Sequence, residues 1–163
     1  MILRNWYQIL LLISILSIII AFSAEYFFNL QPCELCLKQR HPYYFFIFIT
    51  FFMLLILPYL NNFFMSALIQ LGSVYGIFYA GWHVGVENKL LVGPSGCSTG
   101  LSISSNTSDL KEQILSKQVI SCDEVIWSFF GLSAASINLV VLLFIFVMNA
   151  LYIYKYYGSK EKK

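Results

Sequence analysis

Four cysteines are the side chains of this 163-residue sequence best suited to chemistry, and the first two, Cys33 and Cys36, are spaced C-x-x-C. Thiols at positions i and i+3 can close a small disulfide that is readily reduced and re-formed. The reacting species is the thiolate, which a neighbouring cation favours. Arg40 follows Cys36 by one helical turn, so we expect it to lower the pKa of that thiol. The same guanidinium would donate to a carbonyl group lying beside it.

The second pair, Cys97 and Cys122, has 24 residues between its members. Four cysteines allow three pairings, and the obvious one joins Cys33 to Cys36 and Cys97 to Cys122. We interpret both pairs as redox-active, with a static disulfide, or a structural staple for the second pair, as the alternative. A zinc site of four cysteines is a further alternative, but its second half is normally another tight C-x-x-C. No metal is therefore predicted.

His83 and Glu87 lie one helical turn apart. Ionisable groups at membrane depth are often functional, so this pair could hydrogen-bond a quinone oxygen or pass protons. The alternative is an interfacial pair that only anchors the end of a helix.

The composition decides which solvent surrounds these residues. Hydrophobic residues make up 59% of the chain and charged residues 11%, against roughly 25% charged in an ordinary globular domain. One small apolar core cannot hide so much hydrophobic side chain from water, which excludes a soluble enzyme and leaves lipid. The net charge of +2 is spread along the chain and gives no case for binding nucleic acid.

Uncharged stretches mark four membrane spans in a single domain over residues 1–163. A helix needs about 20 apolar residues to cross the bilayer core, and the first stretch, at about 5–24, has that length. A signal peptide cleaved near Ala21 is the alternative, but its apolar region is typically shorter. The 41 residues from 42 to 82 hold two spans, at about 42–57 and 63–82, broken by Pro58 and the following asparagines. The fourth is predicted at about 133–154, with Ser133 as its N-cap.

Two outer loops, at about 25–41 and 83–132, connect these spans and contain all four cysteines. The terminal segments carry five Lys or Arg against one Glu, whereas the loops carry five cations against seven acids. Positive residues near span ends prefer the cytoplasm, so both termini are predicted inside and both loops outside. Within the second loop, Asp109 and Glu112 predict a short helix on the membrane surface. Trp127, Phe129 and Phe130 form an interfacial piece before a break at Gly131.

Three ordered motifs resemble the DsbB family of bacterial disulfide bond formation proteins. The first is Pro32-Cys33-x-x-Cys36-x-x-x-Arg40 after a first span. The second is His83-x-Gly-Val-Glu87 followed by Gly93-Pro94-x-x-Cys97, and the third is Cys122-Asp-Glu-x-x-Trp127-x-x-x-Gly131-Leu-Ser133 before the last span. The likeness covers about residues 20 to 150. It implies an all-α, polytopic membrane four-helix bundle, with a long periplasmic loop that carries a short membrane-surface helix.

The resemblance also implies a role for each site residue. Cys36 matches the cysteine that faces the quinone, Arg40 the arginine beside it, and Cys33 the disulfide partner of Cys36. Cys97 matches the cysteine that forms a mixed disulfide with a DsbA-like, thioredoxin-fold periplasmic protein, and Cys122 the cysteine that resolves it or re-pairs.

The sequence thus predicts a quinone-dependent thiol oxidoreductase, monomeric and multi-pass, in a Gram-negative inner membrane. Ubiquinone is the expected cofactor, with menaquinone as the anaerobic alternative. His83 and Glu87 are candidate quinone-site residues. Two other functions stay open: a non-catalytic scaffold with structural disulfides, and a thiol reductase that runs electrons outward.

Overall fold

The computed structural model of the protein describes residues 2–56, 62–94, 122, 125, 127–129 and 131–155. A 3-10 turn, η1 (Ile2–Asn5), leads into α1 (Trp6–Phe27), α2 (Glu34–Ile56) and α3 (Asn62–Glu87). Two short strands, β1 (Ser128–Phe129) and β2 (Leu132–Ser133), precede the last helix, α5 (Ala134–Ile153). The described residues therefore form an all-α fold, as predicted, with one hairpin made of two strands of two residues each.

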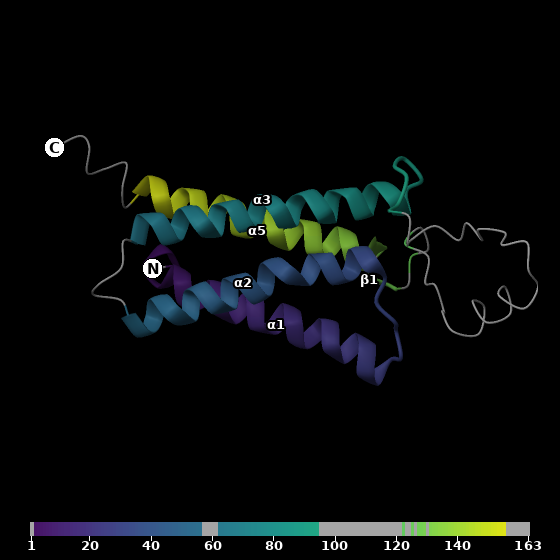
Figure 1. Ribbon diagram of the computed structural model, residues 1–163, viewed down its shortest axis with the longest axis horizontal. Coiled ribbons are helices and arrows are strands. Elements are labelled where there is room, and N and C mark those ends of the chain that lie inside the picture. The colour runs from purple at the N-terminus through teal and green to yellow at the C-terminus, as the bar shows by residue number, and fades with distance from the viewer. Residues whose placement is uncertain are drawn as a thin grey trace, which may run out of the picture.

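The helices run alongside one another as a bundle (Figure 1). α3 packs against both α5 and α2, and α2 packs against α1, whereas α1 and α5 touch little. The start of α1 and the end of α5 lie at one end of the bundle, and the α1–α2 connection and β1 lie at the other (Figure 1). That second end carries the first cysteine pair.

The described part of the chain contains three helices long and apolar enough to cross a membrane: α1, α3 from Phe63 onward, and α5. α2 is not among these three, and its first two turns carry Glu34, Lys38 and Arg40. The span predicted at about 42–57 is the apolar half of α2, so the helix begins earlier than its span and Pro42 lies inside it. The positions of the membrane boundaries themselves stay predictions.

A tight contact fixes the place where three helices meet. A Cβ on Gly76 of α3 would lie 2.9 Å from a Leu142 methyl carbon of α5 and 3.0 Å from Cγ of Pro42 of α2. Only a residue without a side chain lets the helices approach this closely without a shift.

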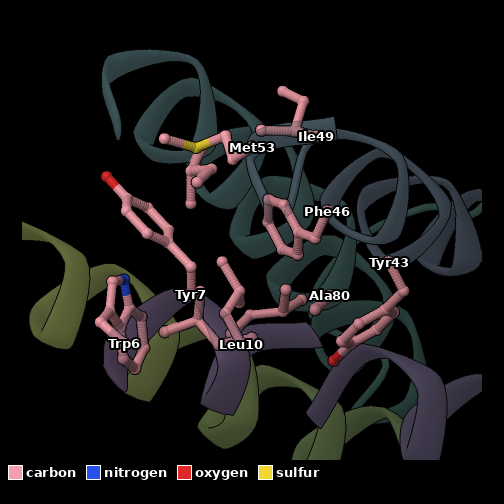
Figure 2. Packing of buried hydrophobic residues seen from close by; sticks show 11 residues of the cluster. Trp6, Tyr7, Leu10, Tyr43, Phe46, Ile49, Met53 and Ala80 are labelled. Carbon is pink, nitrogen blue, oxygen red and sulfur yellow. The ribbon is translucent and has the colours of Figure 1, made fainter. Parts of the chain in front are cut away.

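Most of the buried apolar core lies in the half of the bundle away from the cysteines. Trp6, Tyr7 and Leu10 of α1 pack there with Phe46 and Met53 of α2 (Figure 2).

A group of polar side chains, here named the Asn149 cluster, crosses this core. Asn149 accepts from Trp6 Nε1 at 3.2 Å and donates to Ser66 O at 2.9 Å and Gln70 Oε1 at 2.7 Å. The Ser66 hydroxyl is in turn 2.7 Å from the hydroxyl of Tyr7. The cluster ties α1, α3 and α5 together without a charged group.

The hairpin before α5 confirms two predictions. Gly131 adopts a left-handed backbone with φ +78°, which favours glycine and makes the turn between β1 and β2. Ser133 is the N-cap of α5, and its hydroxyl oxygen accepts from the Ser136 N–H. The surface helix predicted at Asp109 and the side chain of Phe130 lie outside the described residues.

Candidate functional site

The two cysteines of the C-x-x-C motif sit at the N-terminus of α2. Cys33 immediately precedes the helix, and its Sγ accepts from the Cys36 N–H at 3.2 Å, as an N-cap side chain does. The Leu37 N–H donates to the Cys33 carbonyl oxygen at 3.1 Å. A helix N-terminus favours negative charge, so the fold presents Cys33 where a thiolate is stabilised.

Cys33 and Cys36 are free thiols whose sulfur atoms lie 2.7 Å apart. The hydrogen bond from Cys36, assisted by His83, outweighs burial and lowers the pKa of Cys33 from 9.0 to about 5. The same contact raises the pKa of Cys36, and burial adds to that rise. Cys33 is therefore the thiolate of the pair and Cys36 the proton donor.

Arg40 acts on the pKa of the Cys36 thiol in the predicted direction, but other contacts determine the net result. The guanidinium does favour the Cys36 thiolate, but the hydrogen bond with Cys33 and burial outweigh it. Arg40 is also held by Glu25 of α1, which accepts from Nη1 at 2.9 Å, and it lies over the Phe22 ring at 5.3 Å. Its charge is thus largely committed to an ion pair.

His83 lies directly against the thiol pair. It is buried near the end of α3, and its Nε2 is 3.7 Å from Cys33 Sγ and 3.8 Å from Glu87 Oε1. The other carboxylate oxygen of Glu87 accepts from the hydroxyl of Ser133. His83 and Glu87 are therefore placed at the site together, and Ser133 connects them to the start of α5.

Three further residues reach the site that the sequence analysis missed: Gln39, Tyr43 and Asn138. Gln39 Nε2 is 2.8 Å from His83 Nδ1, Asn138 donates to Gln39 Oε1, and Tyr43 donates to Asn138 Oδ1. The only sequence signal is a polar residue inside an apolar helix, such as Asn138, and the i, i+4 spacing of Gln39 and Tyr43.

A cavity of about 240 Å³ opens beside these groups. Residues of α1 such as Ile18, Ala21 and Ala24, and of α5 such as Ala134, Ile137 and Val141, give it mostly apolar walls. Its polar lining includes Cys36, Gln39, Arg40, His83 and Asn138. Apolar walls with a few convergent polar groups are typical of a cofactor site.

Of the second cysteine pair, Cys122 is described and Cys97 lies outside the described residues. Cys122 is buried and disulfide-bonded. It shares one apolar cluster with Cys33, Leu35 and Val86. The fold thus brings a cysteine of the second pair next to the first.

The disulfide at Cys122 contradicts the alternative of a zinc site made by four cysteine thiolates, because a bonded sulfur is not a thiolate ligand. A different set, the sulfur atoms of Cys33 and Cys36 with a ring nitrogen of His83, lies within 4.8 Å. These three atoms are close enough together to bind one soft metal ion, but Cys33 Sγ already contacts both Cys36 Sγ and the His83 ring nitrogen.

An apolar helix bundle with a free C-x-x-C pair at a helix N-terminus, beside an apolar cavity, defines a membrane thiol–disulfide protein. The particular family follows from the sequence. Residues 3–152 match the family described as disulfide bond formation protein DsbB, and the chain belongs to that family. Membership implies a disulfide-forming thiol oxidoreductase of the inner membrane.

One curated relative is similar, the uncharacterized protein RP370 of Rickettsia prowazekii (strain Madrid E). It is 29% identical over 135 residues, which cover 82% of this chain and 77% of the relative. No solved structure matches the chain significantly.

Proposed function

We propose that this protein oxidises the dithiol of a DsbA-like periplasmic protein and passes the two electrons to membrane ubiquinone, with menaquinone as the anaerobic alternative. The partner loses two electrons and two protons and gains a disulfide. The quinone, when bound, accepts both electrons and both protons and leaves as hydroquinone. No oxidant beyond the quinone is needed, so the reaction balances.

The observation that carries this proposal is the cavity beside Cys36. Its volume of about 240 Å³ and its apolar walls suit a flat apolar ring, and Cys36 forms part of its lining. Arg40 provides hydrogen-bond donors there, and His83 lines the same cavity. Because the ion pair with Glu25 engages one guanidinium nitrogen, other Arg40 N–H groups can donate to a quinone carbonyl.

The shared cluster of Cys33 and Cys122 supports the order of the exchange steps. The partner's thiolate attacks the Cys97–Cys122 disulfide at Cys97, and the released Cys122 thiolate attacks Cys33 of the oxidised first pair. Cys36 then leaves as a thiolate at the cavity wall. The partner's second thiolate then displaces Cys97 and closes the partner's disulfide, and the released Cys97 thiolate displaces Cys33 from Cys122. Cys97 and Cys122 are again a disulfide, and Cys33 and Cys36 are left as the reduced pair.

His83 and Glu87 are proposed to serve the proton side of the reaction. Two thiols release two protons as they form a disulfide, and Nε2 of His83 lies near both Cys33 Sγ and the Glu87 carboxylate. The topology that goes with these roles is a single domain with both termini in the cytoplasm, the cysteines in the periplasm, and a monomeric assembly.

The test is quinone reduction by the purified full-length protein in detergent, with a reduced DsbA-like protein as donor. Wild type is compared with Cys36→Ser and Cys97→Ser, and Lys38→Ala serves as a control. Lys38 lies two residues from Arg40, but it contacts the Tyr79 ring instead of the cavity. Turnover that either cysteine substitution abolishes and Lys38→Ala preserves supports the proposal.

Two results would overturn it. A folded protein with accessible thiols that reduces no quinone would favour the scaffold with structural disulfides. Electron flow from hydroquinone to the partner's disulfide under physiological donors would favour the outward-running reductase.

A further inference from the structure

A chain of hydrogen bonds, here named the outer polar chain, runs from the middle of the bundle to the thiol pair. It passes from Tyr43 of α2 to Asn138 of α5, back to Gln39 of α2, and then to His83 of α3. His83 Nε2 ends it 3.7 Å from Cys33 Sγ. Tyr43, Gln39 and His83 are buried and Asn138 is half-buried, so these contacts are largely shielded from bulk water.

The hydrogen bonds of the outer polar chain run from donor to acceptor in one direction. The Tyr43 hydroxyl donates to the amide oxygen of Asn138, which leaves the Asn138 amide nitrogen to donate to Gln39 Oε1. Gln39 must then turn its own amide nitrogen, a donor, toward His83 Nδ1 at 2.8 Å. A ring nitrogen that faces a donor carries no proton, so Nδ1 is the acceptor.

We propose that Tyr43, Asn138 and Gln39 are positioning residues that hold His83 as its neutral Nε2–H tautomer, with this N–H directed at the Cys33 sulfur. The structural part of the proposal stands alone, and its catalytic consequence rests on the proposed function. An imidazolium, protonated at both nitrogens, would place two donors against each other at Nδ1.

The opposite direction, in which all three groups reverse, would put a proton on Nδ1, and a neutral ring in that form is mismatched at its other nitrogen. Nε2 would then present a lone pair to Glu87 Oε1 at 3.8 Å, and a carboxylate offers only acceptors. The Ser133 hydroxyl donates its proton to Glu87, which is how an ionised carboxylate is held. Among the described residues, Arg40 lines the same cavity as the ring, and it is paired with Glu25.

The chemical effect is to supply a hydrogen bond to sulfur without a second positive charge. A donor on Cys33 stabilises every state in which that sulfur is anionic, whether before it attacks a disulfide or after it leaves one. The tautomer decides whether the donor exists, because the Nδ1–H form would present a lone pair to the thiolate instead.

The test is the nitrogen spectrum of the histidine rings in the full-length, reduced protein. The chain has two histidines, so a sample labelled with ¹⁵N-histidine gives two ring patterns, and His41→Gln assigns them. We expect His83 to show one protonated nitrogen, Nε2, and one unprotonated nitrogen, Nδ1. A wild-type His83 in the Nδ1–H form, as imidazolium, or in rapid exchange between tautomers would overturn the proposal.

Substitutions in the outer polar chain make the test specific to this network. Gln39→Glu puts an acceptor against Nδ1, so His83 should become protonated at that nitrogen. Asn138→Asp removes the donor to Gln39 Oε1 and should release the amide to turn, giving a mixture of tautomers. Gln70→Leu removes a half-buried amide from the Asn149 cluster and should leave the His83 pattern unchanged. An unchanged tautomer in both Gln39→Glu and Asn138→Asp would overturn the proposal.

Turnover separates this inference from the proposed function. With a reduced DsbA-like donor and ubiquinone, Asn138→Asp should lower kcat on the order of tenfold, which corresponds to one pKa unit of lost thiolate stabilisation. KM for the quinone should change little. Because the spectrum needs neither partner nor quinone, an inactive protein with the expected tautomer refutes only the function. An active protein with the wrong tautomer refutes only the inference.

Discussion

The Asn149 cluster and the outer polar chain are two buried polar networks in one bundle, and they differ in how they end. The described contacts of the cluster join amides, hydroxyls, an indole and a backbone carbonyl. The outer polar chain ends on a titratable ring, a thiol and a cavity. Contacts among amides and hydroxyls are fixed by folding. A network that ends on reactive groups has one contact that changes when those groups are oxidised, reduced or protonated.

This difference teaches which network stabilises the protein and which one serves its site. Helices in lipid gain little from burying apolar surface against one another, so hydrogen bonds and close packing select the arrangement. The Asn149 cluster joins three helices in this way. The outer polar chain joins α2, α3 and α5. In the arrangement that we propose, its last donor, the His83 N–H, points at the Cys33 sulfur.

The largest effect is expected from Cys36→Ser, which leaves both networks in place and removes a reacting atom. Quinone reduction should fall to background, because a serine hydroxyl cannot form a disulfide with Cys33. The midpoint of thermal unfolding in detergent should stay close to wild type. A large drop in that midpoint would show that the thiol pair also holds the bundle together.

Asn149→Leu should have the opposite effect to Cys36→Ser: it should lower the stability of the fold and leave the activity of the folded protein unchanged. It leaves Trp6 Nε1 and the Gln70 amide oxygen without their partner, at a cost of about 1–3 kcal/mol in the free energy of unfolding. Turnover per folded molecule should be unchanged, as judged from activity normalised to the folded fraction. Val147→Ala, on an exposed face of the same helix, is the matched control.

Arg40→Ala is expected to act on the cavity alone. We predict that KM for the quinone rises about tenfold, equivalent to about 1.4 kcal/mol of binding. The rate of disulfide exchange with the DsbA-like partner should be largely retained, as measured by mixing the oxidised protein with the reduced partner without quinone. If exchange and quinone reduction fell equally, the assignment of Arg40 to the quinone step would be wrong.

The smallest effect concerns pH. Since the pKa of Cys33 is lowered from 9.0 to about 5, the ionised thiol contributes stability to the reduced protein that is complete above about pH 9 and is lost as the pH falls through 5. The thiolate absorbance of wild type minus that of Cys33→Ser should titrate with a midpoint near 5. His83→Phe should raise the midpoint by about one unit. A midpoint near 9 in wild type would contradict the described contacts.

Local chemistry made part of this structure predictable. The cap at Ser133 and the turn at Gly131 follow from their neighbours in the chain, and so does the placement of Cys36 and Arg40 one turn apart. The number of long helices followed from uncharged length alone. None of these features depends on how one helix packs against another.

The outer polar chain could not be predicted in the same way. Its contact from Asn138 to Gln39 joins residues 99 positions apart, and that from Gln39 to His83 joins residues 44 apart. In a lipid-exposed bundle both the buried and the outer faces of a helix are apolar, so the periodicity that marks the buried face of a soluble helix is missing. For the same reason Glu25, the partner of Arg40, was not anticipated.

The atom that caps α2 is also the atom that reacts. The Cys36 N–H donates to Cys33 Sγ, and a sulfur in a disulfide is a weaker acceptor than a thiolate. Each redox cycle therefore tightens and loosens the first turn of α2. Amide hydrogen exchange at Cys36 should be slow in the reduced protein and faster in the oxidised one. The exchange rate at this end of the helix therefore reports the redox state of the thiol pair.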